Sequence, residues 1–423
     1  MSFVTKFARQ FIAKRKEPYT FQSPKNLDLK INNKKVGLYI HVPFCKEICD
    51  FCPYNKTVYN ADLAQKYPES LQKELGHYRK ILPSDVKITS VYIGGGSPTT
   101  LIGGINDILK FLRHNFNFQG DVGLEVHPRD ANPRVLSTLQ EIGITMISLG
   151  IQSFNKNLLH KVGRTGAKFS NKKVAKRAID FGFKCVDIDL MFSDERPHTS
   201  LEDFKTTVEL GADQISTYPL IPFSYTQWGE EYSSKHNFLL RQFRKRDYLN
   251  NFAEIAQKNA YRRTSIWSFT KKFSQRYSSI TRYPFLGVGA GATSCIEDKF
   301  LVNTFSVPDY IQVANKSPPI ALECNLLQRD REIWWLFWQL YNTKISLNEF
   351  KKLFNRSFKR EFPNLVKIAK LLNYFEESGN KIYLSRKGIN FFHVIELIYT
   401  RNYLETVWGK CLKEAWPDKI KLF

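Results

Sequence analysis

Residues 36–52 have the sequence VGLYIHVPFCKEICDFC, in which a β-rich run is followed at once by three cysteines. The run 36–41 predicts a buried strand, since aliphatic, β-branched and aromatic residues fill it. Directly after it, Cys45, Cys49 and Cys52 form a C-x3-C-x2-C pattern on one predicted loop. Cysteine thiolates are the usual ligands of iron–sulfur clusters. Three thiolates on one loop can hold three irons of a [4Fe–4S] cluster and leave the fourth iron open to another ligand.

A structural zinc site is the alternative interpretation of this loop. Such sites use four ligands, commonly in paired cysteines, and no fourth Cys or His stands nearby in a paired pattern. His41 precedes the loop but falls on the predicted strand. We therefore predict Cys45, Cys49 and Cys52 as ligands of a cluster. The other four cysteines are isolated in the sequence, and we expect them to be buried as small apolar side chains: Cys185, Cys295, Cys324 and Cys411.

Strand-like and helix-like patterns alternate six times along the chain. The strands are predicted at 36–41, 88–93, 122–126, 145–150, 184–190 and 213–218. The helices follow near 62–78, 105–115, 132–141, 170–182, 201–210 and 237–259. This alternation predicts an α/β fold with a parallel sheet and right-handed crossovers. Six units make a partial (β/α)6 barrel, in which the chemistry lies at the carboxyl ends of the strands.

Three regions are expected along the 423 residues. Residues 1–35 form an N-terminal extension, where Phe3, Phe7 and Phe11 are spaced as in a short helix. Residues 36–300 form the barrel, and residues 301–423 form a smaller, mostly helical domain. No apolar run is long enough to span a bilayer and no secretory signal is evident. Because three of the seven cysteines crowd into eight residues, we expect metal ligation in a reducing compartment, the cytoplasm.

The chain is strongly basic, with 63 Lys and Arg against 40 Asp and Glu and a net charge of +23. Such an excess favours an anionic partner, whether nucleic acid, an anionic membrane surface or an anionic substrate, or else it forms a solvated basic surface. The basic residues are spread over the whole length, and no nucleic-acid-binding module is recognisable. We therefore predict no nucleic-acid partner.

The motifs, taken in order, resemble the radical S-adenosylmethionine (SAM) superfamily and, within it, the oxygen-independent coproporphyrinogen III oxidase-like group. That group includes the oxidase, heme chaperones, and class C radical SAM methyltransferases and cyclopropanases. The family opening Y-x-H-x-P-F-C is present at residues 39–45, and the glycine-rich turn GGGSPT at 94–99 follows the second strand. The stretches LGIQSF at 149–154 and GVGAGA at 287–292 match further signatures. In the tail, LSRKG at 384–388 resembles the turn into the last helix of the family's winged-helix-like domain.

The resemblance implies a [4Fe–4S] cluster, one or two SAM molecules and an electron donor such as a flavodoxin or ferredoxin. The cluster would reduce SAM and yield a 5′-deoxyadenosyl radical that abstracts hydrogen from the substrate. The positions implied to bind SAM are Tyr39, Phe51, Gly95, Gly96, Ser97, Glu125, Gln152, Arg164 and Asp189. In the class C branch, Tyr39, Gly95 and Glu125 would serve a first SAM, and Gln152, Arg164 and Asp189 a second. No general base is predicted, because no titratable pair at a defined spacing stands out.

Two departures from the family bear on the reaction. The family oxidases carry a fourth cysteine two residues after the third, where this chain has Tyr54. The heme chaperones carry a His-Asn-x-x-Tyr-Trp stretch, and residues 276–283 lack its His-Asn. The stretches 265–269 and 277–282 look closer to the class C branch. We expect a radical SAM enzyme acting on an unsaturated or tetrapyrrole-like small molecule, with methyl or methylene transfer as one reaction. A heme chaperone and a coproporphyrinogen III oxidase are the alternatives.

Overall fold

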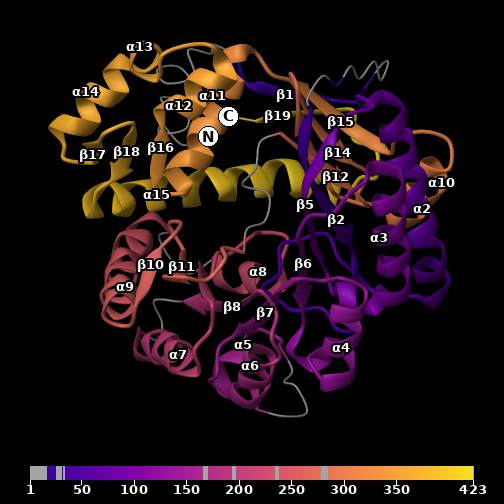
Figure 1. Cartoon of the computed structure of the whole chain (residues 1–423), viewed down its shortest axis with the longest axis horizontal. Helices are drawn as coiled ribbons and strands as arrows, with labels where there is room; N and C mark the ends of the chain where they lie inside the picture. Colours follow the sequence, from indigo (N-terminus) through magenta and orange to yellow (C-terminus); the bar gives the residue numbers. More distant parts are fainter. Residues whose placement is uncertain are drawn as a thin grey trace.

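The computed structural model of the chain describes residues 17–24, 31, 34–164, 170–192, 197–233, 238–277 and 284–422 (Figure 1). The helix predicted around Phe3, Phe7 and Phe11 lies outside the described residues. Within the described part, one sheet of 14 strands runs in the order β10-β11-β9-β8-β7-β6-β5-β2-β12-β13-β14-β15-β1-β19. Its middle section positions the candidate site.

Six neighbouring parallel strands form that middle section, and they confirm the six predicted units. They are β2 (Lys35–Val42), β5 (Lys87–Gly95), β6 (Val122–Val126), β7 (Met146–Gln152), β8 (Cys185–Phe192) and β9 (Gln214–Pro219). The main helices that follow these strands are α2 (Ala61–Ile81), α3 (Ile102–Phe116), α4 (Pro133–Glu141), α6 (Asn171–Asp180), α7 (Pro197–Leu210) and α9 (Phe238–Lys258). The fold is therefore α/β with a partial (β/α)6 barrel. The sequence did not predict the short helices α5 (Lys156–Lys161) and α8 (Gln227–Ser233).

Helix α2 shows how the sequence builds these units. Asn60 caps its start, because the Asn60 side chain accepts a hydrogen bond from the backbone N–H of Leu63 at 3.1 Å. Tyr67 and Leu71 recur at intervals of four, so they share one helix face, and both are fully buried against the sheet. The predicted apolar stripe therefore forms part of the barrel core.

Strands from distant parts of the chain extend the barrel at both edges. On one side β11 (Ser268–Lys271) and β10 (Tyr261–Arg263) add to β9. On the other side lie β12 (Phe285–Val288), β13 (Thr293–Ile296), β14 (Lys299–Asn303), β15 (Ile320–Asn325), β1 (Tyr19–Gln22) and β19 (Lys419–Leu422). Strand β1 pairs with both β15 and β19, so segments near the two ends of the chain lie side by side. The region boundaries near residues 35 and 300 stay predictions.

The C-terminal part is smaller and mostly helical, as predicted. Its helices are α11 (Gln328–Tyr341), α12 (Leu347–Phe354), α13 (Phe358–Glu361), α14 (Pro363–Leu371) and α15 (Arg386–Tyr403). A small sheet, β16-β18-β17, packs with them, from strands Lys344–Ser346, Lys381–Leu384 and Phe375–Ser378. The LSRKG stretch does lead into a helix, since Ser385 caps α15. Figure 1 shows α15 running between these helices and the barrel. In the described part of the chain, no helix has the length and apolarity needed to cross a bilayer.

Candidate functional site

The three predicted ligand cysteines lie on the loop that follows β2. Cys45 ends the short strand β3 (Phe44–Cys45), which pairs with β4 (Thr57–Val58), and its side chain is buried. Burial, with a smaller contribution from the neighbouring Cys52 and Cys49, raises the pKa of Cys45 to about 12. The three thiols are thus close enough to interact electrostatically. A thiol that binds a metal loses its proton. A bound cluster would therefore stabilise the ionised form of these three buried cysteines.

A cluster and a single metal ion place different demands on these cysteines. The described residues contain no group of three or more His, Cys, Asp or Glu arranged to hold one metal ion. In a [4Fe–4S] cluster each cysteine binds its own iron. The four other cysteines lie elsewhere and are all buried, as predicted: Cys185, Cys295, Cys324 and Cys411.

The glycine-rich turn after β5 packs directly on the cysteine loop. The backbone N–H of Gly96 donates to the Val42 carbonyl, and that of Ser97 donates to the Phe44 carbonyl, both at 2.8 Å. A Cβ atom on Gly96 would lie 2.8 Å from the Cys45 sulfur. Gly95 has φ of +122°, which favours glycine, and a Cβ there would lie 2.7 Å from the His41 ring. Glycine is therefore required at positions 95 and 96, because any side chain there would collide with His41 or with the Cys45 thiol.

Glu125 lies on β6 beside this turn. Its two oxygens accept hydrogen bonds from the Tyr92 hydroxyl at 2.6 Å and from the Gly95 N–H at 3.0 Å. Burial raises the pKa of Glu125, whereas these two donors lower it. Tyr39 lies near enough for the charge of Glu125 to raise its hydroxyl pKa, after burial as the larger cause. Three predicted SAM-binding positions, Tyr39, Gly95 and Glu125, are therefore brought together.

Gln152 ends β7, and the side chain of Arg164, which follows α5, reaches the same strand end. The Arg164 guanidinium donates to the Gly150 carbonyl and lies 3.8 Å from the Cys49 sulfur. Gln152 has φ of +65°, in the left-handed region that favours glycine and is uncommon for other residues. A Cβ on Gly150 would lie 3.1 Å from both the Arg164 and Gln152 side chains, which places these two side chains at the same strand end. Strain of this kind is concentrated at functional sites.

Asp189 points into the barrel from β8 and is joined there by Asp187, which the sequence analysis did not single out. Asp189 accepts a hydrogen bond from the Ser148 hydroxyl at 2.5 Å. Asp187 accepts from Gln214 at 2.8 Å and from Ser216 at 2.7 Å. Burial raises the pKa of both carboxyls, that of Asp187 to about 6, and Asp187 also raises that of Asp189. The D-x-D spacing on a strand was an available signal, because residues i and i+2 share a face.

The remaining predicted positions border the cysteines on other sides. Phe51 packs in a small apolar cluster with Val162, Met191 and Leu220. Ser97 is buried and hydrogen bonds to the Cys45 thiol, which lowers the pKa of that thiol. The nine predicted SAM-binding positions thus lie on the cysteine loop, on the glycine turn, on strands β2, β6, β7 and β8, or, for Arg164, beside the end of β7.

Two polar side chains that the sequence did not predict as site residues, Asn55 and Asp130, anchor the cysteine loop. Asn55 is buried and donates to the carbonyls of Ala290 and Phe305, both at 3.0 Å. Asp130 accepts hydrogen bonds from Lys46 at 2.7 Å and Thr99 at 2.6 Å. No local pattern marks either residue, since their partners lie far away in the chain or on other loops.

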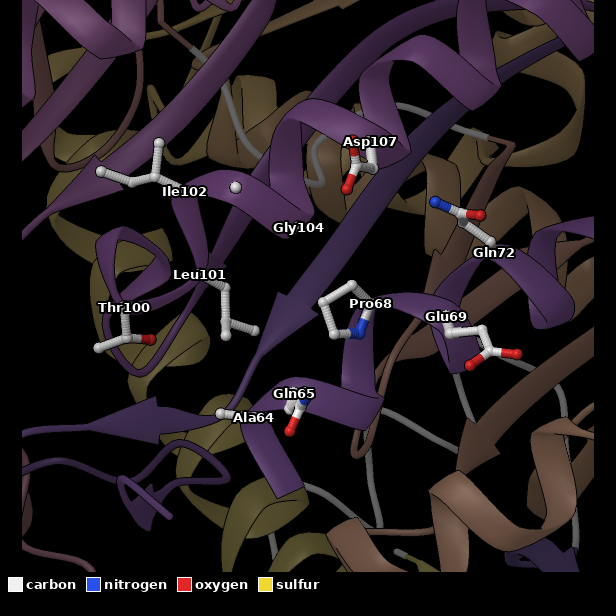
Figure 2. Close-up of a pocket in the computed structure, with 11 residues that line it drawn as sticks. Ala64, Gln65, Pro68, Glu69, Gln72, Thr100, Leu101, Ile102, Gly104 and Asp107 are labelled. Carbon is white, nitrogen blue, oxygen red and sulfur yellow. The ribbon is translucent and has the colours of Figure 1, made fainter. Parts of the chain in front are cut away.

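Two hollows lie near these elements. A recess of about 10 Å³, about the size of one water molecule, adjoins the Cys49 thiol and is lined by Ser97, His127 and Arg164 among others. A larger surface cleft of about 440 Å³ lies between α2 and the start of α3 (Figure 2). In that cleft Pro68 faces Gly104, where a Cβ would come within 2.3 Å of the proline ring. Its lining contains none of the predicted site residues, and we assign it no role.

Comparison with known proteins shows which family part of this chain resembles. The sequence model of the Radical SAM superfamily matches residues 39–210, which hold the cysteine loop, the glycine turn and the strand ends described above. Residues 39–210 are thus similar to the radical SAM superfamily. This similarity implies a [4Fe–4S] cluster and SAM. The residues present fit that cluster, because three thiols on one loop interact electrostatically, Gly96 leaves room for the Cys45 sulfur and Arg164 places a cation beside Cys49.

The relatives of this chain include both heme chaperones and coproporphyrinogen oxidases. It is 26% identical over 364 residues to heme chaperone HemW of Bacillus subtilis, covering 83% of this chain and 95% of the relative. It is 28% identical over 302 residues to oxygen-independent coproporphyrinogen III oxidase of Escherichia coli, covering 66% of this chain and 65% of the relative. The solved structure of E. coli coproporphyrinogen III oxidase (HemN) matches with a TM-score of 0.72 at 20% identity, covering 89% and 96% of the two chains. This last likeness concerns the fold.

Proposed function

We propose that this chain is a radical SAM enzyme that acts on an unsaturated or tetrapyrrole-like small molecule. The observation that carries the proposal is the placement of Cys45, Cys49 and Cys52 on one loop against the glycine turn, within electrostatic reach of one another, with the Arg164 guanidinium 3.8 Å from the Cys49 sulfur. These cysteines would hold the cluster. When bound and reduced, the cluster supplies the electron that cleaves SAM to a 5′-deoxyadenosyl radical.

The chain's own residues would bind and orient SAM. SAM carries an ammonium and a sulfonium as well as a carboxylate, so a pocket for it needs charges of both signs. Glu125 and Asp189 offer carboxylates, and Arg164 offers a guanidinium. The proposed SAM-binding residues remain Tyr39, Phe51, Gly95, Gly96, Ser97, Glu125, Gln152, Arg164 and Asp189.

Within this function we favour methyl or methylene transfer with two SAM molecules. Its support is the resemblance of residues 265–269 to the class C branch, together with Tyr54 where the family oxidases have a fourth cysteine. The cluster also requires a one-electron donor such as a flavodoxin or ferredoxin. Free thiols poised to bind iron suit a reducing compartment, so we propose a cytoplasmic location.

The test is to reconstitute the cluster anaerobically, reduce it, add SAM, and quantify 5′-deoxyadenosine and S-adenosylhomocysteine by mass spectrometry. We expect deoxyadenosine from the wild-type protein and none from the variant that carries Cys45→Ala, Cys49→Ala and Cys52→Ala. Cys411→Ala removes a buried cysteine far along the chain and is the matched control. Accompanying S-adenosylhomocysteine would support methyl or methylene transfer. Intact cluster without deoxyadenosine would contradict the proposal.

A heme chaperone is the second candidate, favoured by the match over 95% of the length of a HemW relative. Stoichiometric heme binding by the wild-type protein, without any SAM-dependent product, would support the chaperone over the enzyme. The absence of heme uptake would exclude it.

A further inference from the structure

Helix α14 presents an apolar face to solvent in the C-terminal part of the chain. Ile368 is 56% exposed, Leu371 is 79% exposed, and Leu372, which caps the end of the helix, is 46% exposed. Because Leu371 and Leu372 follow Ile368 by three and four residues, the three side chains share one side of the helix. We refer to Ile368, Leu371 and Leu372 as the α14 patch. Figure 1 shows α14 at the outer edge of the molecule, away from the barrel.

A different face of α14 holds the helix in place. Val366 and Ala369 are buried, and they belong to the core of the C-terminal part together with Phe350 and Phe358. The helix is therefore anchored by this face, and the α14 patch does not contribute to the core. Exposed groups of large apolar side chains mark sites of interaction with a protein or a membrane.

The surroundings of the α14 patch are strongly basic. Residues 344–391 carry 11 Lys and Arg against 4 Glu and no Asp, a net charge of +7. This segment thus holds nearly a third of the chain's net charge of +23 within 48 of its 423 residues. A partner of the α14 patch should therefore be anionic.

Most of these cations are not neutralised by neighbouring carboxylates. Lys359 and Lys370 share one carboxylate, that of Glu377. In the part of the chain that the structure describes, four further exposed cations form no ion pair: Lys351, Lys352, Arg360 and Lys367. Lys367 lies on α14 itself, four residues before Leu371, so its side chain borders the α14 patch.

Three kinds of anionic partner can be compared with this surface. Nucleic acid is bound through polar and charged side chains that contact phosphates and base edges, whereas the α14 patch offers aliphatic ones. An acidic protein would have to supply a groove that matches a convex helix. A lipid surface needs no such groove, because its acyl region accepts apolar side chains and its anionic headgroups attract lysine and arginine.

We propose that α14 docks the protein on the surface of an anionic membrane, with the α14 patch inserted among the lipids and Lys367 and Arg360 at the headgroups. The helix would lie in the plane of the interface, with its apolar face toward the acyl chains. Apolar insertion and headgroup attraction would both contribute to binding. The inference goes beyond the proposed function and does not depend on it.

The test measures co-sedimentation of the full-length protein with vesicles of phosphatidylcholine, alone or mixed with phosphatidylglycerol. We expect binding to the mixed vesicles that weakens as salt rises, and binding to the neutral vesicles that is at least about ten-fold weaker. The double variant Ile368→Ser and Leu371→Ser should bind the mixed vesicles about ten- to thirty-fold more weakly, since two aliphatic side chains no longer insert. Lys367→Gln should weaken this binding by about five-fold at low salt.

The matched controls are Ile81→Ser and Lys80→Gln. Ile81 is 36% exposed and Lys80 is exposed, and both lie at the end of α2, which Figure 1 shows on the opposite side of the molecule from α14. Both control variants should bind the mixed vesicles as wild type does. If the double variant does not fold, Leu371→Ser alone repeats the test, since Leu371 is the most exposed residue of the α14 patch.

Absence of binding to the mixed vesicles, or binding that the α14 substitutions leave unchanged, would overturn the inference. Equal losses in the α14 variants and the α2 controls would overturn it too, because binding would then follow the overall charge of the protein. Binding of a DNA duplex that Lys367→Gln weakens, without binding to vesicles, would replace the membrane by nucleic acid.

The outcome is separable from that of the proposed function. The α14 variants should form as much deoxyadenosine as wild type when no vesicles are present. Deoxyadenosine without vesicle binding would overturn the membrane inference alone, and vesicle binding without deoxyadenosine would overturn the enzyme alone.

Discussion

Replacing Gly96 by alanine should damage both the fold and the metal site. A Cβ at this position would lie 2.8 Å from each of three atoms: the Cys45 sulfur, the Phe44 carbonyl oxygen and the Pro43 carbonyl oxygen. The two oxygens are backbone atoms held by hydrogen bonds, from the Ser97 N–H and the Thr57 N–H respectively, both at 2.8 Å. The new methyl group must therefore displace either this backbone or the cluster ligand.

The size of the effect follows from these contacts. Overpacking a rigid site costs about 1–3 kcal/mol. Loss of one of the two backbone hydrogen bonds adds about 1 kcal/mol. We therefore expect Gly96→Ala to lower the free energy of unfolding by about 2–4 kcal/mol. Because the Cys45 sulfur is one of the three atoms displaced, we also expect less iron per chain after reconstitution.

The assay measures urea unfolding and bound iron for wild type, Gly96→Ala and a matched control, Gly76→Ala. Gly76 lies within α2, and a Cβ there would meet nothing within 4 Å. Alanine in the middle of a helix is about 0.5–1 kcal/mol more favourable than glycine, so the control should be slightly more stable than wild type. The two variants should thus change stability in opposite directions.

Wild-type stability and wild-type iron content in Gly96→Ala would refute the reasoning. Loss of stability with full iron content would show that the Cys45 thiolate is placed independently of the glycine turn. The same loss in Gly76→Ala would show that the effect is not specific to the site.

Three further outcomes follow from single side chains. Burial raises the pKa of Glu74 to about 7, against an ordinary value of 4.5. The protonated Glu74 therefore stabilises the fold fully below pH 4.5, and this contribution is lost as the pH rises to about 7. In thermal or urea unfolding, the stability of wild type relative to Glu74→Gln should fall over that range by at most about 1.4 kcal/mol per pH unit, and a pH-independent difference would contradict this. Asn55→Ala leaves the carbonyls of Ala290 and Phe305 without a donor and should cost about 2–4 kcal/mol in urea unfolding; a cost below about 1 kcal/mol would show that water replaces the amide. Arg164→Lys replaces the planar, bidentate guanidinium by an ammonium and should weaken SAM binding, measured by calorimetry, by about ten-fold. Wild-type affinity of this variant for SAM would show that Arg164 does not bind SAM.

The strand and helix order of the barrel was predictable because its signals are local. Each unit carries its own apolar period and its own turn residues, as in α2 with Asn60 at its start and Tyr67 and Leu71 on one face. The cluster ligands were predictable for the same reason, since three cysteines within eight residues form one loop whatever surrounds them. The helix α5 was missed because it has only six residues, too few to show a helical period.

The sequence spacing of Asp187 and Asp189 predicted that the two side chains share a face of their strand, but it did not predict the environment of that face. Alternation on a strand places Asp187 and Asp189 on one face. Whether that face is solvent, core or cavity depends on which strands flank it. Gln214 and Ser216 on the neighbouring strand β9 decide the matter, because they bind Asp187 inside the barrel.

The sequence by itself determined the parallel α/β barrel and the cysteine loop, since hydrophobic period and ligand spacing act over a few residues and need no distant partner. The tertiary structure alone decided the pairing of β1 with β19, the anchoring of the cysteine loop by Asn55 to Ala290 and Phe305, and the contact of Tyr54 with Trp408. These contacts join residues hundreds of positions apart. Their partners are selected by how the whole sheet and the C-terminal helices pack, and a single sequence carries no local trace of that choice.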